Sequence, residues 1–239
     1  MHKFRKFIFY RQYKIPFLKN KHSNKRAFII GNGPSLAVDD LELRKDEITF
    51  AANKIWLLFN QTEWRPTYYS ITDRLEMRQN KDNINKVSAD LNFFPCFMVN
   101  EARQVLSNSI YFNNNPDSAD SNLQDGLDIG PTVVYTLIRI SIYMGFHEIC
   151  LLGLDHNYMI PDQYRNFKKG DNNIIISEGE MNHFHKDYRK KGEEWAQPEL
   201  ELLEKYYVKI KKYAEKHNIK IYNASRSTKL EVFEKNMFG

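Results

Sequence analysis

Two histidines and two tyrosines in one stretch of the chain have side chains suited to group transfer. His183 and His185 form a His-x-His pair, and Tyr158 and Tyr164 precede it. Because imidazole titrates near neutral pH, either histidine suits a general base that removes a proton from a sugar hydroxyl. A tyrosine hydroxyl can donate a hydrogen bond to a departing phosphate without adding net charge. The histidines are also compatible with ordinary exposed loop positions.

A His-x-His pair can instead bind metal, but little around this pair favours that use. The chain contains no Asp-x-Asp motif, and its two cysteines, Cys96 and Cys150, do not accompany the histidines. Zinc sites combine several Cys, His or carboxylate ligands. We therefore expect no metal site and no bound cofactor.

A glycine-containing loop is the second candidate site. The apolar run Phe28–Ile30 leads directly into Gly31-Asn32-Gly33-Pro34-Ser35, as expected where a buried strand meets a helical turn. We expect the two glycines to permit positive φ and close approach of a ligand, and the Pro-Ser pair to begin a helical turn whose N–H groups favour phosphate. The alternative is that the glycines serve turn geometry alone. Leu36 stands where a dinucleotide-binding fingerprint has Gly or Ala, so NAD is not favoured.

Further polar residues follow other predicted strands. Ligands of open parallel sheets bind at the carboxyl ends of the strands, so we expect these residues to outline one polar crevice with the glycine loop. Each of them alone could equally be a cap or turn residue. They are Asn53, Thr72, Asp73, Gly130, Thr132 and Asp155.

The alternation of strand-like and helix-like segments predicts an α/β fold with an open, mostly parallel sheet and helices on both faces. Apolar, β-branched or aromatic runs predict strands at 28–30, 47–52, 67–72, 93–99, 109–112, 148–153 and 219–222. Helices are predicted at 53–59, 73–87 and 132–144, and a long one begins at Pro198. The stretch at about 156–192 has no sustained period and predicts a lid or binding loop.

The positive charge of the chain is concentrated at its N-terminus. The formal net charge is +5, but residues 1–26 hold nine Lys or Arg and no acid, which leaves about −4 for residues 27–239. We therefore expect no nucleic-acid-binding face. Basic residues mixed with aromatic ones are typical of a segment that lies on an anionic membrane. A leader without fixed structure and a first helix packed on the domain are the alternatives.

The chain is long enough for one α/β domain, which we expect at 27–239 after a separate basic, aromatic segment at 1–26. The apolar stretch at residues 7–10 is too short for a signal peptide, and no stretch approaches the ~20 apolar residues of a spanning helix. The two cysteines lie in apolar contexts and suggest reduced thiols. The expected location is cytoplasmic, at the inner face of the membrane if residues 1–26 bind lipid.

Several of these motifs resemble glycosyltransferase family 42, bacterial sialyltransferases that extend lipooligosaccharide from CMP-activated sialic acid. The similar segments are Gly31-Asn32-Gly33-Pro34-Ser35-Leu36, Ala52-Asn53 and Gly145-Phe146-His147-Glu148-Ile149-Cys150-Leu151-Leu152-Gly153-Leu154-Asp155. Tyr158 and Tyr164 keep the six-residue spacing of two family tyrosines, and His183-Phe184-His185 is similar to a His-rich segment of the family. The family's Arg-Ile-Thr-Ser-Gly is replaced here by Asp128-Ile129-Gly130-Pro131-Thr132.

The resemblance implies a Rossmann-like fold of the variant glycosyltransferase A type, and a role for each matching residue. Asn32, Ser35 and Asn53 would hold the nucleotide and donor. The two tyrosines would stabilise the leaving phosphate, and His185 or His183 would be the base. Such enzymes invert at the anomeric carbon and need no metal. The chain also resembles the broader MptE-like, pterin pyrophosphokinase-like proteins, through the glycine loop, Ile71-Thr72-Asp73 and Tyr222-Asn223-Ala224.

We therefore expect an inverting, metal-independent glycosyltransferase that acts in the synthesis of bacterial surface polysaccharide or lipooligosaccharide. Its donor would be a nucleotide sugar, most simply a CMP-linked one, and its acceptor a glycan or lipid-linked glycan. The first alternative is an MptE-like pyrophosphokinase that uses a pterin, ATP and Mg²⁺, with Asp73 and Asp155 as the best metal ligands. The second is a non-catalytic nucleotide-binding accessory protein.

Overall fold

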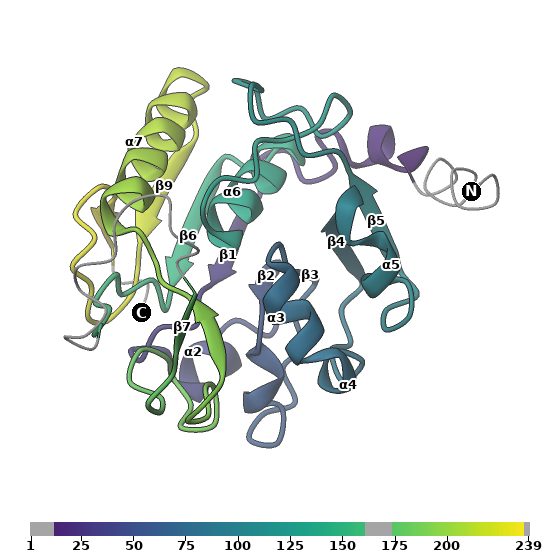
Figure 1. Ribbon diagram of the computed structural model, residues 1–239. Helices are drawn as coiled ribbons and strands as arrows, with labels where there is room; N and C mark the ends of the chain where they lie inside the picture. Colours follow the sequence, from purple (N-terminus) through teal and green to yellow (C-terminus); the bar gives the residue numbers. More distant parts are fainter. Residues whose placement is uncertain (1–11, 161–173, 237–239) are drawn as a thin grey trace.

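An eight-stranded parallel sheet forms the centre of the molecule. The computed structural model describes residues 12–160 and 174–236. The strand order is β10-β9-β6-β1-β2-β3-β4-β5, and every pair of neighbours is parallel (Figure 1). The strands are β1 Arg26–Ile30, β2 Thr49–Ala52, β3 Tyr68–Ser70, β4 Leu91–Pro95, β5 Ser109–Phe112, β6 Glu148–Leu152, β9 Lys220–Asn223 and β10 Glu234–Lys235. The predicted α/β class with an open parallel sheet is confirmed.

The order of the strands creates a switch point between β1 and β6. From β1 the chain builds β2 to β5 on one side, and it later returns to place β6, β9 and β10 on the other. The two central strands pair over their full length, with Ile30 opposite Leu152. The loops that follow β1 and β6 therefore begin side by side and then diverge, which is where open α/β sheets bind ligands.

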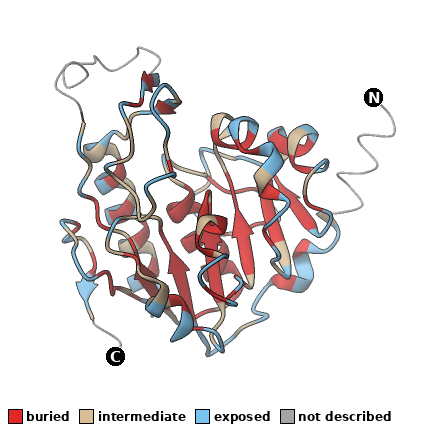
Figure 2. Cartoon of the chain, turned by 90° about the horizontal axis from the view of Figure 1, so that it is seen from below, coloured by how far each residue is buried: buried red, intermediate tan, exposed pale blue. Residues whose placement is uncertain are grey.

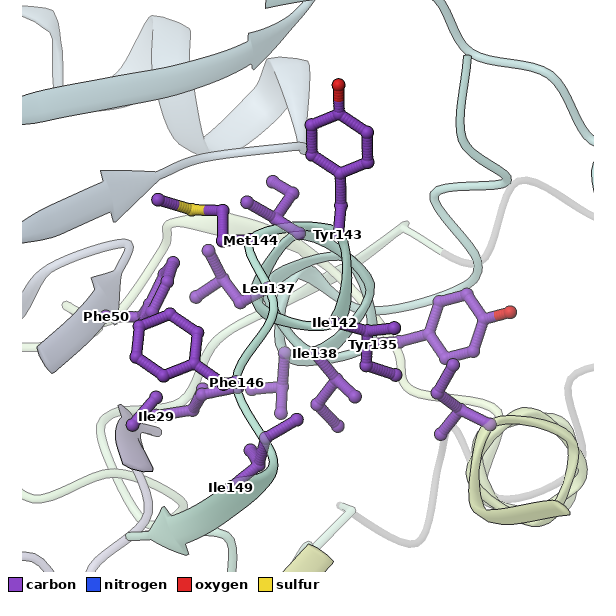
Figure 3. Close-up of a cluster of buried hydrophobic side chains, with 14 of the residues drawn as sticks. Ile29, Phe50, Tyr135, Leu137, Ile138, Ile142, Tyr143, Met144, Phe146 and Ile149 are labelled. Carbon is purple, nitrogen blue, oxygen red and sulfur yellow. The ribbon is translucent and has the colours of Figure 1, made fainter. Parts of the chain in front are cut away.

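Helix α6, Val133–Tyr143, is buried along its whole length because its side chains are apolar around most of the circumference. It packs on one face of the sheet, over β1 and β2, beside the long helix α7, Leu200–Lys216, which packs on β9. Figure 3 shows Leu137 directed toward Phe50 and Phe146, in the same core cluster. The predicted helix 132–144 is confirmed, with Thr132 as its N-cap.

Short helices cover the opposite face of the sheet and pack into a second core cluster. Figure 2 shows the central strands buried and most exposed residues on the outer helices and loops, with the edge strand β10 also exposed. The short elements are α2 Val38–Glu42, η2 Ile55–Leu58, α3 Arg74–Gln79, α4 Lys81–Ile84, η3 Cys96–Met98 and α5 Val99–Ala102.

Three element predictions on this face need correction. The helix predicted at 73–87 is two helices that meet at Asn80, whose side chain bonds back to the carbonyl oxygen of Glu76 at 2.8 Å. The helix predicted at 53–59 is a single 3-10 turn, because Asn53 adopts φ +48°. The strand predicted to run to 99 ends at Pro95, whose ring cannot donate to a sheet ladder.

The N-terminal segment is partly integrated into the core. The 3-10 turn η1, Ile15–Leu18, buries Ile15 and Leu18, whereas Phe17 between them is 76% exposed. The backbone N–H of Asn20 bonds to the carbonyl of Tyr143 at 3.1 Å, at the end of α6. This turn covers an apolar end of α6, so Ile15 and Leu18 pack on the domain; the division expected at residue 27 stays a prediction. The membrane prediction for residues 1–26 falls in part on residues 1–11, which lie outside the described chain, and it stays a prediction.

Strand β7, Ile174–Ile176, lies in the predicted lid and pairs antiparallel with β8, Glu194–Ala196, which follows the predicted end of the lid. Hydrogen bonds attach this region to neighbouring segments: Phe184 N–H bonds to the carbonyl of Asn32, in the loop after β1, at 3.1 Å, and Nε2 of Gln79, in α3, bonds to the carbonyl of Glu194 at 2.9 Å. The region thus lies over the carboxyl ends of the central strands. No helix in the described part of the chain is long and apolar enough to span a membrane.

Candidate active site

The glycine loop after β1 is held against the loop after β6 by its own backbone. Gly31 N–H bonds to the carbonyl of Leu152 at 2.7 Å, and Gly33 N–H to the carbonyl of Gly153 at 2.8 Å. A Cβ on Gly31 would lie 2.5 Å from the oxygen of Gly153, and one on Gly33 would lie 2.6 Å from Oδ2 of Asp155. Neither glycine has a positive φ. The expectation of left-handed glycines is wrong: close packing of the two loops excludes a side chain.

Ser35 and Asp155 lock the two loops together. Ser35 donates to the Asp155 carboxylate twice, from its backbone N–H at 2.7 Å and from its hydroxyl. Burial raises the pKa of Asp155, and these bonds oppose that shift. The expected helix start at Pro34 and Ser35 is also wrong: helix α2 begins at Val38, after Ala37 as N-cap.

Two adjoining cavities open at the switch point. The smaller one, about 80 Å³, is lined by Gly31, Asn32, Gly33, Pro34, Asp155 and other residues of the loops after β1 and β6. The larger one, about 460 Å³, reaches toward Thr72 and Asp73 at the end of β3. Residues that line both are Asn53, Thr132, Val133, Tyr158, His183 and Leu203. The structure thus gathers most of the predicted crevice.

Four predicted residues are not placed in either cavity. Gly130 adopts φ +58° under the ring of Tyr135 and serves the turn before α6. Ser35 acts through Asp155, as described above. Tyr164 lies outside the described residues. His185 lines a separate groove, of about 830 Å³, together with surface residues such as Lys86 and Lys190.

His183 is held in a fixed orientation where the two cavities meet. Its Nδ1 lies 2.9 Å from Oε1 of Glu180, and its ring stacks on Tyr188 with centroids 3.8 Å apart. Its side chain is 12% exposed. Burial lowers the pKa of His183 and the Glu180 carboxylate opposes that shift, while the bond from His183 and neighbouring charges hold the pKa of Glu180 low in spite of burial. This combination describes a neutral imidazole that donates from Nδ1 and keeps Nε2 available as a base.

Asn32 and Asn53 present unsatisfied acceptors at the smaller cavity. The Oδ1 atoms of both are buried and have no hydrogen-bond partner among the described residues. Asn32 is positioned by its Nδ2, which bonds to the carbonyl of Ala52 at 3.2 Å. Buried acceptors of this kind are normally satisfied by a ligand or water. Both amides therefore suit a ligand that brings hydrogen-bond donors.

Tyr158 lies near the N-terminus of α6, on the wall shared by the cavities. Burial raises the pKa of its hydroxyl, with Arg189 opposing and Asp155 adding to the shift, so the group stays neutral and able to donate. The first N–H groups of an eleven-residue helix favour an anion at the same place. The wall is thus suited to a phosphate.

Three residues that hold or line the site were not predicted from the sequence: Glu180, Tyr188 and Arg189. Glu180 could have been found, because it stands three residues before His183, a carboxylate close enough to orient the ring. Tyr188 and Arg189 carried no local signal. Lys54, which donates to the carbonyl of Tyr188 at 2.6 Å, helps to hold them under the sheet edge.

The acidic residues of the site are engaged by the chain itself. Asp73 caps α3 through a 2.7 Å bond from the N–H of Leu75, and Asp155 accepts from Ser35. Within residues 12–160 and 174–236, no group of three His, Cys, Asp or Glu side chains is placed to hold a metal ion.

The fold is shared with known glycosyltransferases. The MAf glycosyltransferase from Magnetospirillum magneticum AMB-1 aligns with a TM-score of 0.57 and 16% identity, over 91% of this chain and 34% of that one. The present chain thus spans about a third of that protein's length. The sialyltransferase CstII from Campylobacter jejuni, solved with the substrate analogue cytidine-5′-monophosphate, aligns with a TM-score of 0.52 and 16% identity. That alignment covers 90% of this chain and 86% of CstII.

Comparison of the sequence, as distinct from the structure, gives a different result. Among proteins with curated annotation, none matches it significantly in sequence. A family model described as 6-hydroxymethylpterin diphosphokinase MptE-like matches residues 3–161, more than half of the chain. The protein therefore belongs to the MptE-like family.

Proposed function

We propose that the protein is an inverting glycosyltransferase that uses a nucleotide-activated sugar. The single observation that carries the proposal is the Glu180–His183 pair at the junction of two cavities. A transferase must bring a donor and an acceptor together at one base, and this is the geometry that two adjoining chambers with a shared histidine supply. The shared fold with two glycosyltransferases supports the same class.

In the proposed reaction, an acceptor hydroxyl attacks the anomeric carbon of the donor. Nε2 of His183 takes the hydroxyl proton as the new C–O bond forms. The bond from the anomeric carbon to the phosphate oxygen breaks on the opposite side, and the nucleotide leaves with the electron pair. Tyr158 and the α6 N-terminus stabilise its negative charge, and Glu180 stabilises the imidazolium. This scheme places no metal ion in the reaction.

We further propose a CMP-linked donor and a role in bacterial surface polysaccharide synthesis. The nucleotide in the CstII complex and the motifs shared with family 42 support this choice. Asn32 and Asn53 would bind the donor through their free Oδ1 atoms. Residues 1–26 would hold the enzyme at the inner face of an anionic membrane, near a lipid-linked acceptor.

The second candidate is a pterin diphosphokinase, which the family match favours. It would transfer diphosphate from ATP and would use Mg²⁺. Asp73 and Asp155 remain its best ligands, but each would have to give up a hydrogen bond that now holds a loop or helix. A non-catalytic nucleotide-binding protein would leave the Glu180–His183 pair without a purpose.

Binding and turnover separate these candidates. The melting temperature is measured with CMP, UDP and ATP, each with Mg²⁺ and with EDTA; the proposal expects the largest rise with CMP and no effect of EDTA. Turnover is then measured as nucleotide release from CMP-sialic acid and other nucleotide sugars. His183→Ala should lower kcat by ~10²–10⁴-fold, and the matched variant His185→Ala should stay within about threefold of wild type.

The opposite results identify the alternatives. Binding of ATP only with Mg²⁺, with diphosphate transfer to a pterin, would establish the kinase. Loss of turnover in His185→Ala but not in His183→Ala would place the base in the outer groove.

A further inference from the structure

The larger of the two cavities contains polar atoms that the fold does not satisfy. Its volume of about 460 Å³ falls in the range of small-ligand sites. Arg189 lines it with a side chain only 10% exposed. Nη2 of Arg189 bonds to Glu76 at 2.9 Å, but its Nε and Nη1 are buried and have no partner among the described residues. Oε1 of Gln197, which also lines this cavity, is likewise buried without a hydrogen-bond partner among the described residues.

A ligand of this cavity must accept hydrogen bonds from the unsatisfied donors and donate one to the unsatisfied acceptor. A carboxylate or phosphate could accept from Arg189 but could not donate to Gln197. A hydroxyl group does both, because it has one donor and two lone pairs. A ligand with several hydroxyls can therefore satisfy the guanidinium and the amide together.

The charges around the cavity also disfavour an anion. The described lining holds three carboxylates, of Asp73, Glu76 and Glu199, against the one guanidinium of Arg189. Glu76 already neutralises that guanidinium. A negatively charged ligand would be repelled by the carboxylate of Asp73, whereas a neutral hydroxyl can donate a hydrogen bond to it.

Position links this cavity to the proposed reaction. His183 lines both cavities, so a hydroxyl bound in the larger one would lie beside the proposed base. We propose that the larger cavity is an acceptor subsite for an uncharged, hydroxyl-rich saccharide, recognised by Arg189 and Gln197. This inference rests on the proposed function, which identifies the saccharide as the acceptor. Binding of the saccharide can be tested without measuring turnover.

Trp195 offers a reporter inside the subsite. It is 5% exposed, and the guanidinium of Arg189 lies 4.7 Å from its ring centroid. The chain has three tryptophans, so the ¹⁵N-indole spectrum has three signals, and Trp195→Phe assigns the one that matters. Titration uses the neutral methyl glycosides of galactose, glucose, mannose and N-acetylglucosamine. The matched anion is methyl galactosiduronate, which differs from the galactoside by one carboxylate.

We expect at least one neutral glycoside to shift the Trp195 signal at millimolar concentration and the uronate to bind at least fivefold more weakly than the galactoside. Gln197→Leu should weaken glycoside binding by at least fivefold and leave the Kd for CMP within twofold of wild type. Gln197 suits this test because its replacement breaks no hydrogen bond of its Oε1 in the described chain. Arg189→Lys, which keeps the charge but removes the planar fork, should have a similar effect, and Arg78→Gln on the exposed side of α3 should have none.

Each contrary result has a distinct meaning. CMP binding without any response of Trp195 to the four neutral glycosides would overturn the subsite while leaving the proposed function intact. Tighter binding of the uronate would overturn the choice of an uncharged ligand. Glycoside binding in a protein that binds no nucleotide would support the subsite and remove the proposed transferase.

Discussion

A single added methyl group at Gly33 tests how the two central loops are held together. In Gly33→Ala the new Cβ would lie 2.6 Å from Oδ2 of Asp155 and 2.7 Å from the carbonyl oxygen of Gly153. Both distances are shorter than a carbon and an oxygen tolerate, so one of the two loops must move. We therefore expect the substitution to destabilise the folded protein even without any ligand.

The size of the effect follows from the bonds at stake. Moving the Asp155 side chain weakens its bonds from Ser35, and a bond to a charged group contributes ~1.5–3 kcal/mol. Moving the backbone instead weakens the Gly33–Gly153 bond, which contributes ~0.5–1.5 kcal/mol, and leaves ~1–3 kcal/mol of overpacking. Alanine restores ~0.4–1 kcal/mol by restricting the unfolded chain. The net loss in unfolding free energy should be about 1–3 kcal/mol.

The assay is urea unfolding followed by circular dichroism, with Asp155→Ala and the double variant completing a cycle. If the new Cβ meets the Asp155 carboxylate, the double variant should lose less than the sum of the single losses, by ~0.5–3 kcal/mol. The reasoning is refuted if Gly33→Ala unfolds within ~0.5 kcal/mol of wild type but binds nucleotide poorly. That result would mean that a ligand, and not the β6 loop, requires the glycine.

Four further predictions address the base, the N-terminal turn and the proposed subsite. Burial lowers the pKa of His183 and Glu180 opposes that shift; Glu180→Gln should therefore move the acidic limb of the kcat–pH profile to lower pH and reduce the plateau, and a move to higher pH would contradict the pairing. The folded state disfavours protonation of His183. The stability that His183 contributes should therefore be complete above pH ~6.5, the ordinary pKa of histidine, and should be lost as the pH falls below it. Unfolding curves of wild type and His183→Ala at several pH values measure this loss. Leu18→Ala should cost ~2–4 kcal/mol of unfolding free energy, whereas Phe17→Ala, at a 76% exposed position, should cost less than ~0.5 kcal/mol; equal costs would mean that η1 is not packed as described. Gln197→Leu should leave the melting temperature unchanged or slightly raised, because it removes a buried acceptor without a partner, and a clear loss of stability would reveal a bond that this acceptor makes.

The sequence alone determined the elements whose signal is local. Helix α6 was predicted over its full length because an apolar surface around eleven residues, a Thr before it and a Gly after it are all contained in one short segment. The β1 and β6 strands were visible for the same reason, as continuous apolar runs. Their parallel pairing follows from the alternation of strands and helices, and with it the position of the crevice.

Local sequence patterns did not predict features that depend on packing between segments remote in the chain. Gly31 and Gly33 were noticed from the sequence, but the reason for them is the loop after β6, which lies about 120 residues away in the chain and closes on them. Ile15 and Leu18 were assigned to a separate leader because nothing near them shows that α6 leaves an apolar end to cover.

The candidate base shows most clearly what tertiary structure decided. His183 and His185 have the same side chain, the same polar surroundings in sequence and a separation of two residues, so the sequence left either as the base. In the folded chain, the Phe184–Asn32 backbone bond and the stacking of Tyr188 turn the two imidazoles to different sides, one into the junction of the cavities and one into the outer groove. Such a choice depends on which distant backbone groups need a partner, and only the packed structure brings those groups within hydrogen-bond distance.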